Sequence, residues 1–402
     1  MRRADWVGLP EGVTPLAGGG VTTPQGFAAG SAACGLKGSF ALDIGLLVSL
    51  RPAASALVDT VSALPSAAVL HTRSLDPAAL QGVVVNAGNA NAATGSPGRD
   101  DAAAMGARAA RGVGREPGQI AVCSTGTIGE RLRMDLVGPG IDRAAAEAGP
   151  DGGAGFGQAI CTTDRWPKGG AFTVRLPSGR EVALGAAAKG AGMIRPHMAT
   201  MLCYVTPDAP LRADALARMT ADAAERSFNR ITVDGQMSPS DTLLVLANGA
   251  GEPLAGADAD AFAAALAAAC RLVAVQMVKD GEGAEHAFRV LVRGARDDEE
   301  ARAVARAVGD SPLVKSAAFG RDPNWGRISQ AVGQALSGRG GPPARLEVAF
   351  DGVAHDDPAV AEVLAREEYD LQVSLGRGDG AAEVFACDLT HAYVTLNAEY
   401  HT

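Results

Sequence analysis

The chain has 402 residues, of which 47% are apolar and 20% charged, and its formal net charge is −9. This length exceeds what one ordinary hydrophobic core holds, so we expect two or three domains or two large halves of one molecule. The acidic balance lacks the clustered Lys and Arg that nucleic-acid binding needs, which argues against a nucleic-acid partner.

Cysteine usage and the N-terminus indicate the compartment. The six cysteines are scattered and form no CxxC pair, which favours reduced thiols over a disulfide framework or a zinc site. The first residues, MRRADWVGLPEG, lack the apolar core of a secretion signal. The most apolar segment, 41–50, contains Asp43 and is too short to cross a membrane. We therefore expect a cytoplasmic protein with no membrane partner.

Two short apolar runs in the N-terminal half predict buried strands that end in polar loops. Residues 83–85 lead into NAGNANAATG (86–95), and residues 120–123 lead into STGTIG (124–129). Loops at strand ends are where binding and catalytic residues concentrate. Residues 100–111 predict a helix between the two strands.

The loop STGTIG has three interpretations. The first is a strand-to-helix turn in which Ser124 or Thr125 caps the helix. The second is an oxyanion hole, because small residues leave backbone N–H groups free to face a developing negative charge. The third is a phosphate-binding loop, but the pattern GxxxxGK[ST] is absent.

The stretch KGAGMIRPHMATMLC (189–203) sets Thr200 directly after the small residue Ala199. One interpretation is a glycine turn that leads into a buried strand. The other is a latent nucleophile. Cleavage of the Ala199–Thr200 bond would give Thr200 an α-amine, with a reference pKa of roughly 7.7–8.0, beside its own hydroxyl. That amine would be a general base built into the nucleophile.

The remaining segments alternate between helical and extended patterns. The glycine-rich residues 149–157 predict a mobile loop, and the C-terminal run 392–402 predicts a strand. The class is therefore mixed α/β with largely antiparallel strands. The other expected elements are a hairpin at 172–184 around Pro177, Ser178 and Gly179, helices at 211–227, 258–278 and 297–308, and strands at 286–292, 346–350 and 371–375.

Several polar segments have both a structural and a functional interpretation. In VKDGEGAEH (278–286), Glu282 belongs either to a solvated acidic turn or to a site that receives a substrate amine. His197 precedes the latent nucleophile, although a lone histidine is more often structural than catalytic. Residues 226–242 and 319–328 form surface loops, or else the walls of a polar pocket.

Taken in order, the motifs resemble those of the ornithine acetyltransferase family, the bifunctional glutamate N-acetyltransferases. The resemblance runs along nearly the whole chain. Its motifs are GVTTPQGF, NAGNANAATG, STGTIG followed by LRMD, TTD with PK nearby, KGAGMIRPHMATML, SFNRITVDG, DGEGA, SPLVKSAAFGRDPNWGRI and CDLTHAYVTLNAEYHT.

The resemblance implies a chain that cuts itself at Ala199–Thr200. One subunit would then span residues 1–199, and the second would span 200–402, with a C-terminal subdomain from about 285. The implied fold is a layered αββα sandwich of the N-terminal-nucleophile-like type, related to aminopeptidases. Two copies of each subunit are expected to form a heterotetramer.

The resemblance also implies the site. Thr200 is the expected nucleophile, and Thr125 and Gly126 are the expected oxyanion hole. The expected substrate contacts are Thr162, Thr163, Lys189, Thr200, Glu282, Asn397 and Thr402, with Thr163 preferred of the two TTD threonines.

The implied reaction is ping-pong acetyl transfer from N-acetylornithine to glutamate in arginine biosynthesis, through an acetyl ester on Thr200. No cofactor or metal is expected, with acetyl-CoA as an alternative acetyl donor. Small-molecule substrates and the two subunits are the expected partners.

The chain departs from the family pattern beside the nucleophile and in one loop. Arg195 and His197 replace a small or acidic residue and an asparagine, and the common VDGDTSTND is here VDGQMSPSD (233–241). These changes put the substrate side chain in question and favour the first of three alternatives, and the other two stay open independently of them. The three alternatives are a paralogue with an altered amino-acid substrate in a specialised pathway, an amidohydrolase or aminopeptidase of the same fold, and an uncleaved, non-catalytic binding protein.

Overall fold

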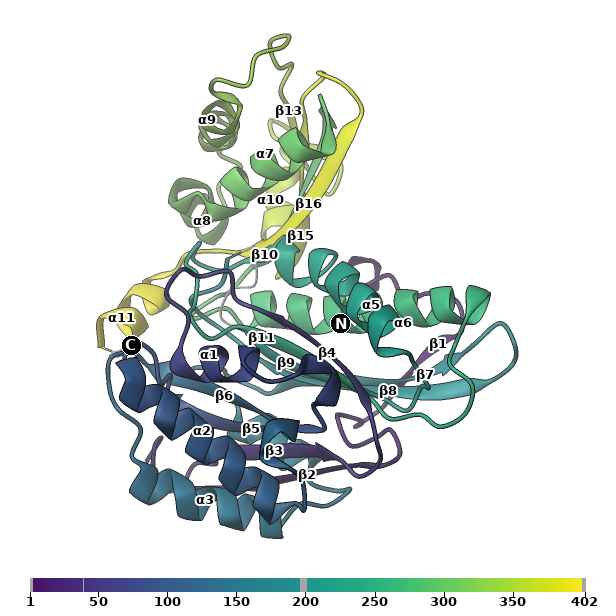
Figure 1. Ribbon diagram of the computed structural model, residues 1–402. Coiled ribbons are helices and arrows are strands. Elements are labelled where there is room, and N and C mark those ends of the chain that lie inside the picture. The colour runs from purple at the N-terminus through teal and green to yellow at the C-terminus, as the bar shows by residue number, and fades with distance from the viewer. Residues whose placement is uncertain (1–2, 39, 196–200, 400–402) are drawn as a thin grey trace.

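The computed structural model describes residues 3–38, 40–195 and 201–399. The chain forms a body of four stacked layers and a smaller lobe above it (Figure 1). Three sheets organise the molecule, two in the body and one in the lobe. Most neighbouring strands run antiparallel, as expected from the sequence.

The upper sheet of the body, sheet A, connects the two sides of the Ala199–Thr200 junction. Its strands β8 and β9 pair antiparallel, with Lys189 opposite Leu202. The turn between β7 and β8 contains Gly179 at φ 85°, which confirms the expected hairpin. In spatial order the strands are β1 (Val13–Leu16), β7 (Lys168–Arg175), β8 (Glu181–Lys189), β9 (Leu202–Pro207), β11 (Thr242–Ala247) and β4 (Ala54–Asp59).

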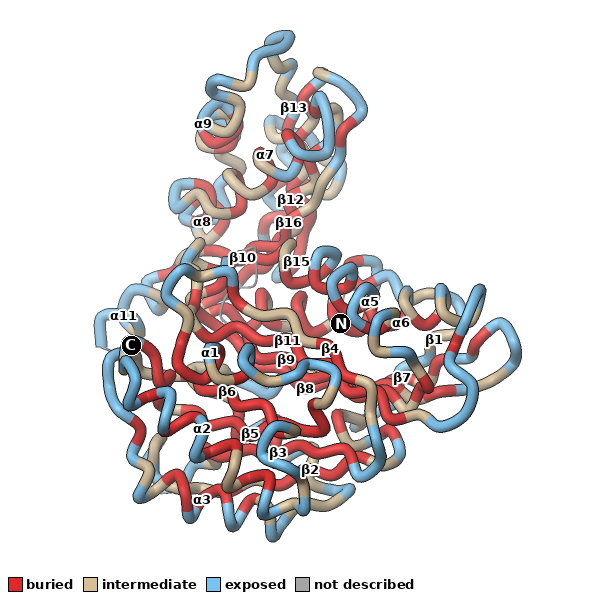
Figure 2. The backbone as a smooth tube through the Cα atoms, in the orientation of Figure 1, coloured by how far each residue is buried: buried red, intermediate tan, exposed pale blue. Residues whose placement is uncertain are grey.

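The lower sheet of the body, sheet B, packs face to face on sheet A. Buried side chains of both sheets share one apolar layer, in which Tyr204 of β9 meets Phe156 edge-on at 5.3 Å between ring centroids. Figure 2 shows this buried layer running through the strands. The strands of sheet B in spatial order are β2 (Phe27–Ala32), β3 (Ile44–Ser49), β5 (Gly82–Asn89) and β6 (Ile120–Thr127).

Helices cover the outer face of each body sheet. Met105 and Ile141 bury the inner sides of α2 and α3 against sheet B, and Phe262 and Val273 bury α6 against sheet A. Burying one such side chain stabilises the fold by roughly 1.5–3 kcal/mol. The resulting order of layers confirms the expected αββα sandwich (Figure 1). The body helices are α1 (Ala67–Arg73), α2 (Gly95–Gly112), α3 (Met134–Ala146), α4 (Gly153–Ala159), α5 (Ala213–Glu225) and α6 (Gly256–Lys279).

The lobe is built on a third sheet, sheet C, whose inner face packs against α7. Asp297 caps α7, because its Oδ1 accepts a hydrogen bond from the Glu300 N–H at 2.8 Å. The strands of sheet C in spatial order are β10 (Ile231–Thr232), β16 (Gly380–Cys387), β12 (Ala287–Ala295), β15 (Glu368–Ser374), β13 (Glu347–Phe350) and β14 (Val353–Ala354). The helices that follow α6 are α7 (Asp298–Asp310), α8 (Pro312–Phe319), α9 (Trp325–Leu336), α10 (Val360–Leu364) and α11 (His391–Glu399).

Two expectations about local structure are wrong. The C-terminal run is helix α11, not a strand, and its start is capped by Thr390, whose Oγ1 accepts from the Tyr393 N–H at 3.2 Å. The glycine-rich residues 149–157 include the start of α4, in which Phe156 is fully buried. Tertiary contacts override the local pattern in both places.

Helix α6 is long and apolar enough to cross a membrane by composition alone. In the structure, 61% of its apolar window is buried inside the protein, where it packs against sheet A and α5. It is therefore a core helix of the body.

Candidate active site

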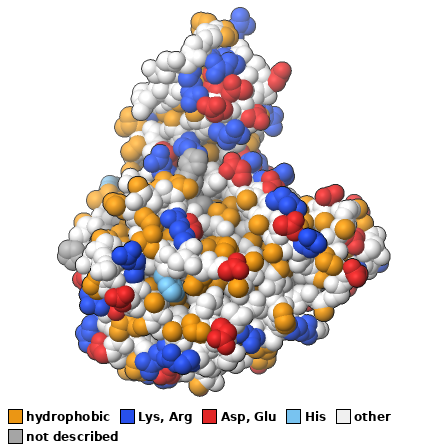
Figure 3. Space-filling model, viewed as in Figure 1, with side chains coloured by type: hydrophobic (Ala, Val, Ile, Leu, Met, Phe, Trp, Pro, Cys, Tyr) orange, Lys and Arg blue, Asp and Glu red, His pale blue; other side chains and the backbone are white. Residues whose placement is uncertain are grey.

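A cavity of about 330 Å³ lies where β6 and β8 end, beside the turn after α6 and beside α11. Its walls hold one lysine and two carboxylates among many uncharged polar groups. Outside the cavity, acidic and basic side chains are interspersed over the face drawn in Figure 3. The residues that line the cavity are Ala90, Thr125, Gly126, Ile128, Thr162, Thr163, Lys189, Gly192, Met193, Asp234, Gln236, Met237, Ser238, Pro239, Ser240, Glu282, Tyr393 and Asn397.

Thr125 and Gly126 are residues of β6, just before the strand ends at Thr127. Gly126 adopts φ 130°, and a Cβ there would collide with the backbone of Gly88 on the neighbouring strand β5. Only glycine fits this close approach of two strands. Ser124 donates its hydroxyl to Asn86 Oδ1 at 2.6 Å, within the sheet. The interpretation of STGTIG as a helix cap is therefore wrong.

Lys189 is the last residue of β8, and it is buried. Its Nζ donates to Thr125 Oγ1 at 3.2 Å. In the described parts of the chain, no carboxylate lies within 4.0 Å of this ammonium group. A buried ammonium without a directly bound anion is well suited to bind a carboxylate ligand.

Glu282 lies opposite, in the turn after α6, with both carboxylate oxygens held. Thr163 donates to Oε1 at 2.7 Å and Asn397 donates to Oε2 at 2.9 Å. The Glu282 N–H donates to the Ala191 carbonyl at 2.8 Å, and a Cβ at Gly192 would collide with the carboxylate. Glu282 is therefore a fixed acceptor in the cavity, and the interpretation of a purely solvated turn is wrong.

A buried ion cluster supports the wall next to Lys189. The Asp164 carboxylate pairs with Lys168, which also pairs with Asp280, and all three side chains are fully buried. Burial opposes ionisation of Asp164, but the Lys189 and Lys168 ammonium groups outweigh it and lower the pKa to about 2. Asp164 also accepts from the Thr162 N–H at 2.8 Å. The cluster orients Thr162 at the cavity.

Three of the expected site and cleavage positions, and one of the departures from the family pattern, lie outside the described residues. Ala199, Thr200, His197 and Thr402 are among the residues that are not described. Arg195 is described and exposed.

The chain on the far side of the junction is fixed at Met201. Its N–H donates to Asp241 Oδ1 at 2.9 Å, just before β11 begins at Thr242. Asp241 is fully buried, and burial raises the pKa of its carboxyl well above the ordinary value. Met201 is therefore held where β9 and β11 begin, and its carbonyl also accepts from the Thr242 N–H at 2.9 Å.

The sequence did not single out Asp234 and Tyr393 as parts of the site. Asp234 accepts from the N–H groups of Met193 at 2.6 Å and Ile194 at 3.0 Å. Tyr393 donates its hydroxyl to Asp234 Oδ2 at 3.4 Å. Burial raises the pKa of Asp234 and of Tyr393. Asp234 belongs to the motif VDG and Tyr393 to the motif THAY. Membership in these motifs was the sequence signal that could have identified both residues.

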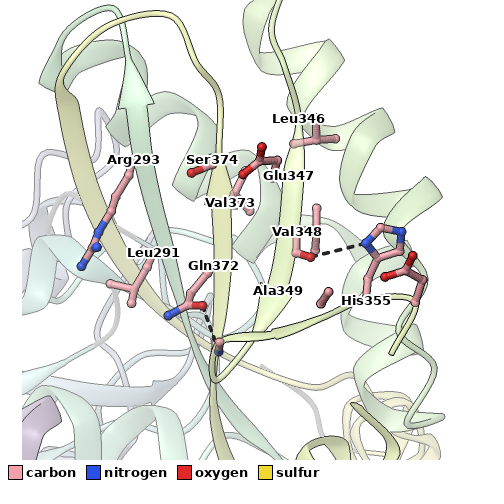
Figure 4. Close-up of a pocket in the computed structure, with 13 residues that line it drawn as sticks. Leu291, Arg293, Leu346, Glu347, Val348, Ala349, His355, Gln372, Val373 and Ser374 are labelled. Carbon is pink, nitrogen blue, oxygen red and sulfur yellow. Dashed lines mark hydrogen bonds between the residues drawn. The ribbon is translucent and has the colours of Figure 1, made fainter. Parts of the chain in front are cut away.

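A larger hollow of about 490 Å³ lies on the outer face of sheet C and contains none of the expected site residues. Figure 4 shows its side chains on neighbouring strands, with Arg293 and Glu347 on either side of Ser374. Its hydrogen bonds are local, such as Gln372 Oε1 accepting from the Gly352 N–H at 3.0 Å. This hollow lacks convergent buried polar groups.

The described residues contain no group of three or more His, Cys, Asp or Glu side chains arranged to hold a metal ion. All six cysteines are free thiols in the structure, four of them buried.

Relatives of this chain match it over almost its whole length. The arginine biosynthesis bifunctional protein ArgJ of Symbiobacterium thermophilum is 45% identical over 400 residues, which cover 96% of this chain and 99% of that protein. The protein of the same name from Synechocystis sp. is 39% identical over 409 residues, with 96% and 98% covered. A solved ornithine acetyltransferase from Mycobacterium tuberculosis, complexed with ornithine, is 36% identical with a TM-score of 0.42, covering 47% of this chain and 100% of that chain. The model of the ArgJ family matches residues 28–402, which confirms the resemblance carried by the motifs: this chain belongs to the ArgJ family.

Proposed function

We propose that this chain is a glutamate N-acetyltransferase that moves an acetyl group from N-acetylornithine to glutamate in arginine biosynthesis. One observation carries the proposal. Thr125, Lys189 and Glu282 converge in one cavity, and Leu202, two residues after Thr200, pairs with Lys189. The names of the relatives, arginine biosynthesis bifunctional proteins, support the same activity.

In this proposal the first reaction is self-cleavage. The Thr200 hydroxyl attacks the Ala199 carbonyl carbon, the C–N bond breaks, and hydrolysis of the resulting ester frees Ala199. Thr200 then carries an α-amine that serves as the base for its own hydroxyl. Sheet A supports this sequence of events, because the β8–β9 pairing holds the two products together after the cut.

The second reaction is acetyl transfer in two half-reactions. The Thr200 hydroxyl attacks the acetyl carbonyl of N-acetylornithine, and its proton passes through the α-amine to the departing ornithine nitrogen. Thr125 and Gly126 stabilise the oxyanion, which is an interaction that often contributes the largest part of catalysis in acyl transfer. The amine of glutamate then attacks the acetyl ester, the C–O bond to Thr200 breaks, and Thr200 recovers its proton.

The charged groups of the cavity suit an amino-acid substrate. Lys189 neutralises an α-carboxylate, and Glu282 accepts from a substrate ammonium group, with Thr162 or Thr163 and Asn397 beside them. Both ionic contacts are charge-assisted hydrogen bonds, which are stronger than neutral ones. Thr402 is proposed to complete the site.

The proposal extends to assembly and location. Two copies of each subunit form a cytoplasmic heterotetramer in which residues 1–199 and 200–402 are the two subunits. No resident cofactor takes part, and acetyl-CoA serves as a second acetyl donor in the bifunctional form of the activity.

A second candidate is a paralogue with a different amino-acid substrate. Gln236, Met237 and Pro239, the positions at which this chain departs from the family pattern, all line the cavity. A change in three wall residues alters the shape that a substrate side chain meets.

Intact mass under denaturing conditions tests the proposal. We expect two fragments that meet at Ala199–Thr200, with one acetyl group on the second after N-acetylornithine is added and none after glutamate follows. Thr200→Ala is expected to give one uncleaved, inactive chain. Acetyl release to water without transfer would identify an amidohydrolase, and a better donor than N-acetylornithine would identify the paralogue. Acetyl transfer by Thr200→Ala would overturn the assignment.

A further inference from the structure

Helix α11 covers one side of the cavity, and its first residue, His391, makes an edge-on ring contact with Phe319 at 5.5 Å between centroids. None of its residues is buried, and Figure 2 draws it largely as exposed. Its side chains reach the body mainly through polar contacts, from Asn397 to Glu282 at 2.9 Å and from Tyr393 to Asp234 at 3.4 Å. A helix held in this way depends on individual hydrogen bonds, because hydrophobic burial contributes little to its docking.

The Tyr393 contact lies in the middle of this attachment. One turn before it, Thr390 Oγ1 donates to the Gly283 carbonyl at 2.8 Å, which fixes the start of the helix. One turn after it, Asn397 reaches Glu282. Tyr393 therefore sets the orientation of α11 relative to the body, because the start of the helix is already fixed by Thr390.

Asp234, the acceptor for Tyr393, is itself rigidly placed. It accepts from the N–H groups of Met193 at 2.6 Å, Ile194 at 3.0 Å and Gln236 at 3.0 Å. Met193 has φ 56°, so Asp234 holds an unfavourable backbone conformation in the chain that leads to the junction. Asp234 thus offers α11 a fixed point beside Met193 and Ile194.

We propose that Tyr393 is a positioning residue that makes the cavity selective for substrates with a cationic side chain. This inference rests on the proposed acetyltransferase function. By docking on Asp234, Tyr393 holds α11 so that Asn397 binds one oxygen of Glu282 while Thr163 binds the other. With both oxygens held, the carboxylate keeps one orientation toward the cavity and meets a substrate ammonium without first losing rotational freedom.

The inference predicts a selective loss. Without the Tyr393 hydroxyl, α11 and Asn397 shift, Glu282 rotates, and the contact with a substrate ammonium weakens. A substrate of the same length without a side-chain amine makes no such contact, so its affinity stays unchanged. A general loosening of the cavity would instead weaken the binding of both kinds of substrate, with and without a side-chain amine.

Tyr393→Phe tests the inference in the full chain, because it removes one hydroxyl and keeps the ring. We expect the KM for N-acetylornithine to rise about tenfold, as for the loss of a hydrogen bond to a charged group, with kcat nearly unchanged. The inhibition constant of N-acetylnorvaline, which has the same carbon chain and no side-chain amine, should stay at its wild-type value. Thr395→Val removes a hydroxyl from the same helix, outside the cavity, and should leave both constants unchanged.

Amide hydrogen exchange of residues 391–399 provides a second measurement that needs no substrate. Exchange should be faster in Tyr393→Phe than in the wild type and in Thr395→Val. The inference is overturned by a wild-type KM in Tyr393→Phe, by a parallel rise of both constants, or by unchanged exchange. If the wild-type chain itself fails to transfer acetyl from N-acetylornithine, the proposed function fails, and the exchange result still decides whether Tyr393 docks the helix.

Discussion

Two hollows of this molecule differ in kind, the candidate active site at the end of sheets A and B and the hollow on the outer face of sheet C. The hollow on sheet C has the larger volume, about 490 Å³ against about 330 Å³. The walls of the candidate site come from segments far apart in the sequence, and they include the buried residues Thr125 and Lys189. The charged walls of the other hollow, such as Arg293 and Glu347, are exposed. Volume alone therefore does not identify a site, and convergence of buried polar groups does.

Removing the cation from each hollow should separate them most strongly. We expect Lys189→Met to lower kcat/KM for N-acetylornithine by on the order of 10²–10³, because a buried charge next to Thr125 and the substrate carboxylate is lost. Arg293→Met, the matched change in the hollow on sheet C, should leave kcat/KM within about twofold, since surface changes away from a site have small effects. Equal losses in the two variants, measured by steady-state kinetics on folded protein, would contradict the contrast.

A glycine in each hollow gives the next largest contrast. Gly126→Ala should lower the free energy of unfolding by about 3 kcal/mol or more, because φ 130° is strained for alanine and the new Cβ collides with Gly88. Gly352→Ala, at φ 83° with no atom within 4 Å, should cost only about 1 kcal/mol. Denaturant unfolding of both variants measures the difference. A cost at Gly352 as large as that at Gly126 would show that backbone strain alone explains both values.

Only part of the expected site could be marked by local pattern. Thr125 follows the apolar run of β6, so the pattern that predicts this strand also marks its polar end. Lys189, which ends β8 beyond the predicted hairpin, is identified only through the family resemblance. The layer order followed from the family resemblance, since local patterns carry no information about which sheets stack.

Long-range contacts made the remaining features unpredictable from local pattern. The run Ala-Tyr-Val-Thr-Leu in α11 has β-forming side chains, yet capping by Thr390 and docking on Asp234 make it a helix. Asp234 reads as part of a polar loop, and its role depends on partners 40 and 159 residues away in the chain. Such pairings are decided by tertiary structure.

Acid should weaken the candidate site through Asp164. The folded-state pKa of Asp164, about 2, lies below the unfolded value of roughly 3.9. The ionised carboxylate therefore stabilises the fold by about 2 kcal/mol above pH 4. This stabilisation is lost as the pH falls from 4 toward 2. Asp164→Asn should therefore flatten the decline of the unfolding free energy across that range. Asp356→Asn, an exposed carboxyl in the hollow on sheet C, should change the free energy by no more than about 0.5 kcal/mol. An unchanged slope in Asp164→Asn would show that other carboxyl groups cause the decline.

The smallest expected effect concerns Met237, a half-buried wall residue of the candidate site. Met237→Thr shortens an apolar side chain where it faces the cavity. We expect the ratio of kcat/KM between N-acetylornithine and other N-acetyl amino acids to change by about two- to fivefold. The effect is small because the contact of Met237 with a substrate is only partly desolvated. Leu291→Thr makes a similar change in the hollow on sheet C and should leave that ratio unaltered. Total activity should change little in both variants. A shift in the ratio confined to Met237→Thr would make this wall residue a determinant of substrate choice, whereas equal ratios in both variants would assign selectivity to the charged groups alone.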